Sequence, residues 1–331
     1  MNVILMLMLL LFITGCSSIN DVPYGSDIPY DITETTTTST TTTMQPTTTT
    51  TTTTRITTTR PNSVMRTTAD LDNLFRSWGN NISVFYYCIN TGFTYRYNAN
   101  RVYFGASISK APLALLLYQM ADRGEINLDA TMRFEARHRN TGSGIINRNY
   151  PLGTSFTIRR LIALNLYRSD NVATLMLREF LGDGDPYLGV ERYRQFVTSL
   201  GANPNHVGIR IMNSQLTVND AGVFARAIHS YIQSENPHSR EFQRHLRNNH
   251  FPFLFREVDV DTGSKTGWTA VDRYGTFQGV WHDMSFVYGD IPFILVVMTS
   301  GRAGSQGGSA RDREDFTNIS KAFLEFHRNR S

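Results

Sequence analysis

The chain has 331 residues, 40% hydrophobic and 11% aromatic, which suits a folded protein of one large or two small domains. The formal net charge is +4 and the pI is near 9.1, but Lys and Arg form no block, which argues against nucleic acid as a partner. Two cysteines exclude a disulfide framework, and the 8 histidines lack metal-ligand spacing, so we expect neither a metal nor another cofactor.

The N-terminus has the pattern of an export signal. Residues 3–13 form an apolar run, too short to span a bilayer comfortably, that ends in Ile-Thr-Gly before Cys16. This ending resembles a bacterial lipobox, which implies a signal peptide over residues 1–15, lipidation of Cys16 and an extracytoplasmic protein whose lipid anchor holds it on the cell membrane. A plain signal peptide or an uncleaved anchor is the alternative, since no Lys or Arg precedes the run. All three interpretations predict export.

Residues 16–66 are predicted to be a disordered linker. The stretch 33–59 is mostly threonine and has no apolar periodicity, so it cannot bury a core. A flexible coil of roughly 45 residues spans about 40 Å, and up to roughly 140 Å when stretched. We interpret the segment as a tether. An adhesin-like stalk, with the function in the threonine tract itself, is the weakest alternative.

The folded domain is predicted over residues 67–331. Helices and strands are expected in this order: helix 67–78 with Thr67 as its cap, strands 82–90 and 93–98, helix 107–123, helical residues 157–181 interrupted near 168–171, helix 217–231, strands 264–268, 276–281, 284–288 and 293–299, and helix 312–328. The first and last blocks can join into one sheet. We therefore predict an α+β fold, an antiparallel sheet flanked by helices with an all-helical lobe beside it.

Three short motifs follow one another within this domain. They are Ser107-Ile-Ser-Lys110, Ser169-Asp170-Asn171 and Lys265-Thr266-Gly267. A Ser-x-x-Lys motif alone is expected about once by chance in a chain of this length, but each of the other two is expected only roughly 0.05 times. The three in order are therefore a strong signal of one catalytic site.

The first motif predicts a nucleophile and its base. Ser107 and Lys110 are three residues apart, so on a helix they share a face. A serine hydroxyl needs a base, and a lysine can serve once burial or a nearby cation such as Lys265 lowers its pKa. The backbone N–H of Ser107, at the start of the helix, can also bind an oxyanion. For an isolated motif, a helix cap followed by a snorkelling lysine would be the better interpretation.

The second motif offers polar groups for proton transfer and binding. The Ser169 hydroxyl can relay a proton to a leaving nitrogen, and both ends of the Asn171 carboxamide can hydrogen bond a substrate amide. Asp170 is expected to order the turn locally rather than to react. Alone, this motif would be read as an ordinary turn within the helical block.

The third motif is expected on a strand. Lys265 can bind a substrate carboxylate and lower the pKa of Lys110, and Thr266 supplies a hydroxyl. Gly267 lets a ligand approach the backbone closely. Trp268 would present a second oxyanion N–H, and its ring is either a wall of the cleft or part of the core.

With these motifs, residues 67–328 resemble the class A-like serine β-lactamase and penicillin-binding protein (D,D-peptidase) family. The resemblance implies a serine hydrolase in which a β-lactam or a D-alanyl peptide of peptidoglycan acylates Ser107. It also implies the roles given above for Lys110, Ser169, Asn171, Lys265 and Thr266.

One departure from that family concerns hydrolysis of the acyl-enzyme. Class A β-lactamases carry a Glu-x-x-Leu-Asn loop that positions the deacylating water, but residues 201–216 contain no Asp or Glu. Since losing a positioned general base typically costs about 10²–10⁴ in rate, we expect normal acylation and slow deacylation. A non-catalytic cell-wall or antibiotic-binding lipoprotein on the same fold is the alternative. Arg273 is a weak further candidate for carboxylate binding.

Overall fold

The computed structural model describes residues 66–206, 214–269, 279–301 and 310–330. The predicted signal peptide, Cys16, the threonine linker and Arg273 lie outside these ranges. No helix within them is both long and apolar enough to cross a membrane. The second cysteine, Cys88, lies within these ranges and is buried and free.

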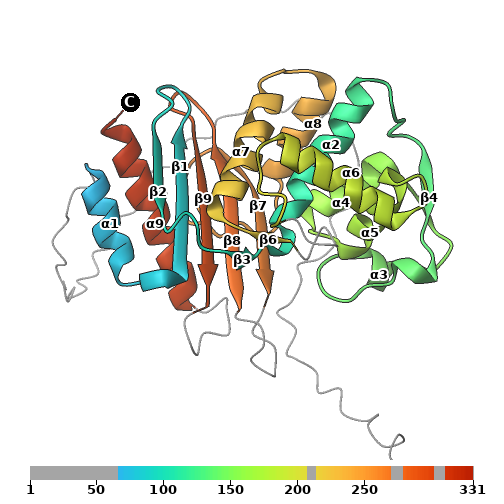
Figure 1. The fold of residues 1–331 in the computed structure, drawn as a ribbon, viewed down its shortest axis with the longest axis horizontal. Helices are drawn as coiled ribbons and strands as arrows, with labels where there is room; N and C mark the ends of the chain where they lie inside the picture. Colours follow the sequence, from blue (N-terminus) through green and yellow to red (C-terminus); the bar gives the residue numbers. More distant parts are fainter. Residues whose placement is uncertain (1–65, 207–213, 270–278, 302–309, 331) are drawn as a thin grey trace, which may run out of the picture. The chain divides into compact units, whose positions relative to one another are not determined.

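Five strands form one antiparallel sheet in the order β2-β1-β9-β8-β7 (Figure 1). They are β1 (Ile82–Cys88), β2 (Thr94–Tyr97), β7 (Thr262–Thr269), β8 (Val280–Val287) and β9 (Phe293–Ser300). The N-terminal hairpin therefore pairs directly with the C-terminal strands, as predicted, with Val84 opposite Val297. The strand that carries the third motif, β7, lies at one edge of the sheet.

The prediction of two strands at 276–281 and 284–288 was wrong in one respect. β8 runs without a break through His282 and Asp283, whereas residues 276–278 lie outside the described ranges. The predicted gap fell at two adjacent polar residues, and Asp is depleted in strands. Both side chains are instead buried and hydrogen bonded inside the sheet region.

Helices cover both faces of the sheet (Figure 1). Side chains on alternate strand positions point to opposite faces. Val84 and Tyr86 belong to a core shared with α1 (Thr68–Arg76) and α9 (Ala310–Arg328), while Phe85 belongs to a core shared with α7 (Val218–Ile232). Thr67, the predicted cap of α1, forms a capping box, and Thr217 forms another at the start of α7.

The middle of the chain forms the predicted helical lobe. Its longer helices are α4 (Ile158–Tyr167), α5 (Asn171–Leu181), α6 (Pro186–Ser199) and α8 (Pro237–Arg247), with the short α3 (Ile146–Asn149), β4 (Thr131–Arg133) and β5 (Ser155–Thr157). The predicted interruption near 168–171 is confirmed, because α4 ends before the second motif and α5 begins within it. The sequence also indicated where α6 and α8 begin, although this pattern was not used in the prediction. Each helix has proline as its first residue, directly after an Asp or Asn cap.

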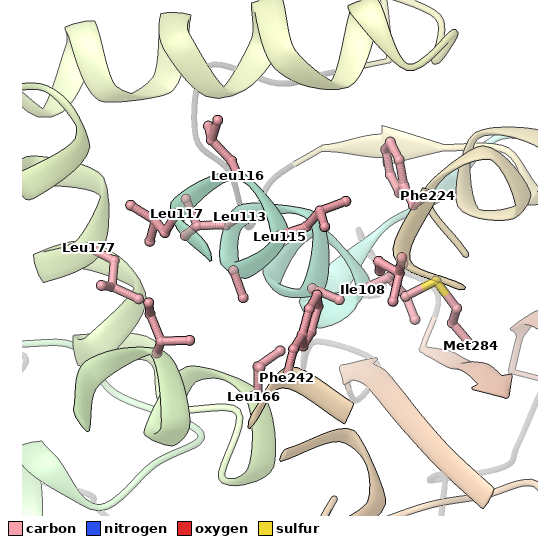
Figure 2. Packing of buried hydrophobic residues seen from close by; sticks show 14 of the residues in the cluster. Ile108, Leu113, Leu115, Leu116, Leu117, Leu166, Leu177, Phe224, Phe242 and Met284 are labelled. Carbon is pink, nitrogen blue, oxygen red and sulfur yellow. The ribbon is translucent and has the colours of Figure 1, made fainter. Parts of the chain in front are cut away.

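The nucleophile motif leads into a helix whose first nine residues are all buried. A 3₁₀ turn, η2 (Ala106–Ser109), continues as α2 (Lys110–Asp122), which stops before Gly124. The helix is buried on all sides over its first nine residues. Figure 2 shows Leu113, Leu115, Leu116 and Leu117 directed around its circumference toward neighbouring helices and the sheet. A helix that is apolar all round occupies a central position, so Lys110 enters the core with it.

Candidate active site

The nucleophile turn lies against the edge strand. Ser107 is half-buried in η2, and the residue before it, Ala106, has a left-handed backbone conformation with φ of 46°. A β-carbon added to Gly267 on β7 would lie 2.7 Å from the backbone nitrogen of Ser107 and 2.9 Å from that of Ile108. The first and third motifs are therefore in direct contact, and only glycine permits this approach.

Lys110 makes three hydrogen bonds to the second motif. Its buried ammonium donates to the Ser169 carbonyl oxygen, to Ser169 Oγ at 3.2 Å and to Asn171 Oδ1 at 2.8 Å. Burial lowers the pKa of Lys110 well below its ordinary value, the positive charge of Lys265 lowers it further, and Asp170 opposes both effects. These causes favour the neutral amine, the form that can accept a proton.

Lys265 donates a hydrogen bond to the same hydroxyl group of Ser169. Its fully buried ammonium donates to Ser169 Oγ at 3.0 Å and to the carbonyl oxygen of Thr266 at 2.6 Å. Burial lowers the pKa of Lys265 to about 7, against the opposing charge of Asp283. The structure thus brings residues from all three motifs together, although they are distant in the chain.

Asp170 holds the turn of the second motif, as predicted from its residue type. It caps α5 by accepting from the Ala173 N–H, and its other carboxylate oxygen accepts from the N–H groups of Ile145 and Ile146 at 2.6 and 2.9 Å. Ser169 itself has a φ of 52°. A left-handed serine is strained by an amount on the order of 1–3 kcal/mol, and the buried Asp170 network maintains that conformation.

Both ends of the Asn171 carboxamide are already hydrogen bonded. Its oxygen accepts from Lys110, and its nitrogen donates to the Thr141 carbonyl oxygen at 3.0 Å and to Asn140 Oδ1 at 3.3 Å. A substrate amide must therefore replace one of these partners or use the second lone pair of the Asn171 oxygen.

The third motif and Trp268 alternate between the two faces of β7. Alternation places Thr266 and Trp268 on the face opposite to Lys265 and Gly267. The Trp268 ring is 46% exposed and stacks on Trp281, with ring centroids 5.4 Å apart.

Three polar side chains that support the site were not predicted from the sequence. Asn165 of α4 donates to the carbonyl oxygen of Lys110 at 3.0 Å, and Tyr193 of α6 donates to that of Ser109 at 3.1 Å. Asn249 donates to Ser264 Oγ at 2.8 Å, next to the third motif. A single polar residue within the apolar run of α4 was a usable signal for Asn165, since buried polar groups are nearly always hydrogen bonded.

The C-terminal end of the loop between α6 and α7 lies beside the nucleophile turn. The Ser214 carbonyl oxygen accepts from Gly105 N at 2.7 Å, and β6 (Gln215–Leu216) pairs with β3 (Tyr103–Phe104). At its start the loop is tied to Asp220 of α7, which accepts from Asn203 N and contacts His206 Nδ1 at 2.7 Å.

That carboxylate is fully engaged in holding the loop. Burial raises the pKa of Asp220, but hydrogen bonds from the Asn203 amide and from Thr217 outweigh burial and leave it below its ordinary value. A carboxylate with so many donors is a weak base. In the part of the chain that the structure describes, no group of three or more His, Cys, Asp or Glu residues could hold a metal ion.

Comparison with known proteins agrees with this geometry. The model of the beta-lactamase enzyme family matches residues 66–326, which include all three motifs. The chain belongs to this family. No curated protein matches it.

Solved structures of the β-lactamase family share the fold. A β-lactamase from Sphaerobacter thermophilus is 19% identical and covers 78% of this chain and 97% of its own, with a TM-score of 0.64. PBP-A is 17% identical (80% of this chain, 98% of its own, TM-score 0.64), and the extended-spectrum β-lactamase TLA-3 is 16% identical (78% and 99%, TM-score 0.66). At these identities the likeness shows a common α+β fold, that of class A β-lactamases and PBP-A.

Proposed function

We propose that this protein is a serine hydrolase whose Ser107 is acylated by β-lactams or D-alanyl peptides and whose acyl-enzyme is hydrolysed slowly. The observation that carries the proposal is the convergence of two buried ammonium groups, Lys110 and Lys265, on the Ser169 hydroxyl beside the nucleophile turn. A structural role alone gives no reason to bury two lysines against one neutral acceptor, because desolvating each charge is costly.

Acylation begins with proton transfer from Ser107. A charged Lys110 directs its three N–H bonds to Ser169 and Asn171, so base action requires the neutral amine, whose lone pair replaces one of these contacts. The Ser107 oxygen attacks the substrate carbonyl carbon as Lys110 takes its proton. The Ser107 N–H and the Trp268 N–H are the two donors that we assign to the oxyanion.

The acyl-enzyme forms when the tetrahedral intermediate collapses. The C–N bond of the β-lactam or peptide breaks, and its electron pair goes to nitrogen. Ser169 gives that nitrogen its hydroxyl proton and recovers one from Lys110 or Lys265, which both contact its oxygen. We assign attraction of the substrate carboxylate to the charge of Lys265, and hydrogen bonds with the substrate to Thr266 and Asn171.

Slow deacylation is proposed from the chemistry of the 201–216 loop. The loop sequence has no carboxylate, and nearby Asp220 is occupied by its own hydrogen bonds. A solved structure of a leucine-to-glutamate variant of PBP-A is an acyl-enzyme complex with penicillin G, 17% identical to this chain. It supports β-lactams as ligands for this fold.

A second part of the proposal concerns the N-terminal segment and how the protein is located. We propose export, cleavage after residue 15, lipidation of Cys16 and tethering of the domain, 67–331, to the cell membrane by the linker, 16–66. Radiolabelled palmitate is expected to enter wild-type protein but not a Cys16→Ala variant produced in a bacterium. Incorporation into both proteins would contradict lipidation at this cysteine.

A fluorescent penicillin and a chromogenic cephalosporin test the catalytic part. We expect stable labelling of the purified domain, loss of labelling in Ser107→Ala, and little cephalosporin hydrolysis. Rapid cephalosporin turnover would instead identify an efficient β-lactamase. An absence of labelling would favour the alternative, a non-catalytic cell-wall or antibiotic-binding lipoprotein.

A further inference from the structure

A fully buried histidine lies beneath the nucleophile turn. His282 is on β8, and its partner in the antiparallel register is Gly267, the residue that contacts the backbone of Ser107. The three motifs do not include it.

The hydrogen bonds of His282 define its tautomer. The Thr299 N–H donates to Nδ1 at 3.2 Å, so Nδ1 carries no proton. Nε2 therefore carries the hydrogen and donates to the carbonyl oxygen of Phe104 at 2.9 Å. Burial lowers the pKa of His282 to about 4, which keeps the ring neutral near pH 7.

The bond to Phe104 acts on a short and strained segment. Phe104 ends β3, which is only two residues long, and is followed by Gly105, the left-handed Ala106 and then Ser107. A left-handed alanine persists only when its surroundings hold it in place. The neighbouring Tyr103 adds a second attachment, because its ring packs edge-on against His282 and its hydroxyl lies 2.9 Å from Ser83 Oγ.

We propose that His282 is a positioning residue that fixes the Phe104–Ser107 segment to the sheet and so sets the nucleophile and its N–H against β7. The proposal rests on the proposed acylation of Ser107. One side chain joins the two segments that carry the assigned oxyanion donors, since it bonds to Phe104, three residues before Ser107, and its residue pairs with Gly267, the residue before Trp268. Loosening the bond moves the turn relative to β7 without removing a group that touches substrate.

Two variants separate the bonds of His282. In His282→Gln the side-chain nitrogen reaches about as far as Nε2 and can still donate to Phe104. In His282→Asn the shorter side chain can accept from the Thr299 N–H but cannot reach Phe104. A displacement of about 1 Å at a reacting group can cost on the order of 100-fold in rate, so the two variants are expected to differ clearly.

The test measures the acylation rate constant and the non-covalent dissociation constant of a fluorescent penicillin separately. We expect His282→Gln to acylate within about threefold of wild type, and His282→Asn to acylate roughly 10- to 100-fold more slowly with an unchanged dissociation constant. Equal rates in all three proteins, or equal losses in both variants, would overturn the proposal. A merely structural role predicts rates that follow thermal stability.

Two further measurements do not depend on acylation. The ¹⁵N spectrum of His282 in wild-type protein is expected to show protonated Nε2, and protonated Nδ1 would overturn the proposal even if His282→Asn does not fold. Hydrogen exchange at the Gly105 amide, which bonds to Ser214, is expected to be faster in His282→Asn than in His282→Gln. If wild-type protein is not labelled by penicillin, the proposed function fails, while these two results still decide whether His282 fixes the turn.

Discussion

Lys110 and Lys265 share one hydrogen-bond acceptor. Their ammonium nitrogens lie 3.2 and 3.0 Å from Ser169 Oγ, and both side chains are fully buried. Two buried ammonium groups that share one acceptor repel each other, which disfavours full protonation of both near neutral pH. The pair therefore favours one neutral amine, and we propose that it is Lys110, because burial and the charge of Lys265 both lower its pKa.

This division of roles predicts that mutating the two lysines slows acylation to different extents. Lys110→Ala is expected to abolish acylation of Ser107 more completely than Lys265→Ala, because the first variant removes the base and the second an electrostatic contact. Loss of a general base costs typically about 10²–10⁴ in rate. The rate of labelling by a fluorescent penicillin measures both variants, and equal residual rates would contradict the assignment of Lys110 as the base.

The buried Lys265 also predicts how stability depends on pH. Its pKa is about 7 in the folded protein against an ordinary value of 10.5, so the unfolded chain binds more protons between these values. The free energy of unfolding should therefore rise with pH, by up to about 1.4 kcal/mol per pH unit, and fall as pH returns toward 7. Urea denaturation between pH 7 and 9 measures this slope.

Lys265→Met is the control for that slope. The variant cannot titrate at this position, so its free energy of unfolding should depend less on pH than that of wild type over the same range. Parallel pH profiles for the two proteins would show that Lys265 has an ordinary pKa in the folded state.

The contact between Gly267 and the nucleophile turn predicts a steric effect. In Gly267→Ala the new methyl group would meet the backbone nitrogen of Ser107 at 2.7 Å, so the turn or the strand must shift. We expect acylation to slow by roughly 100-fold or more, the scale for losing one oxyanion donor. Thr262→Ala, at the far end of β7, should change the labelling rate little. Similar rates for the two variants would mean that the turn tolerates the displacement.

Asn165 is expected to contribute to stability through its bond to the core helix. Asn165→Ala leaves the buried carbonyl oxygen of Lys110 without its side-chain donor, which should lower the free energy of unfolding by about 1–3 kcal/mol. Thr174→Val removes only the hydroxyl that contacts Asn165 Oδ1 and the Asp170 carbonyl oxygen, and should cost less. Urea denaturation compares the two, and a larger loss in Thr174→Val would contradict the role given to Asn165.

The sequence predicted the sheet, the helical lobe and the three motifs because each leaves a local pattern. Cap residues located the starts of α1 and α7, and short runs of apolar, β-branched and aromatic residues located β1 and β9. Tertiary hydrogen bonds leave no such pattern. His282 fell between two predicted strands, because nothing nearby in sequence shows that the Phe104 carbonyl oxygen, 178 residues away, accepts a hydrogen bond from it.

The hydrogen bonds and backbone conformations of the site residues could not be predicted for the same reason. The sequence predicted which residue types gather at the site, but not that Asn171 is already bonded at both ends or that Ala106 is left-handed. Both facts follow from how the 140–146 loop and β7 pack around the motifs. Spacing within a motif cannot specify contacts that other parts of the chain make with it.

Intact-protein mass spectrometry after penicillin treatment, followed over time, tests the central claim most directly. We predict a single adduct with the mass of the intact β-lactam that forms in wild-type protein, persists for many minutes after free drug is removed, and is absent from Ser107→Ala. An unmodified wild-type mass at all times, or an adduct that survives the Ser107→Ala substitution, would contradict a nucleophilic Ser107 at this site.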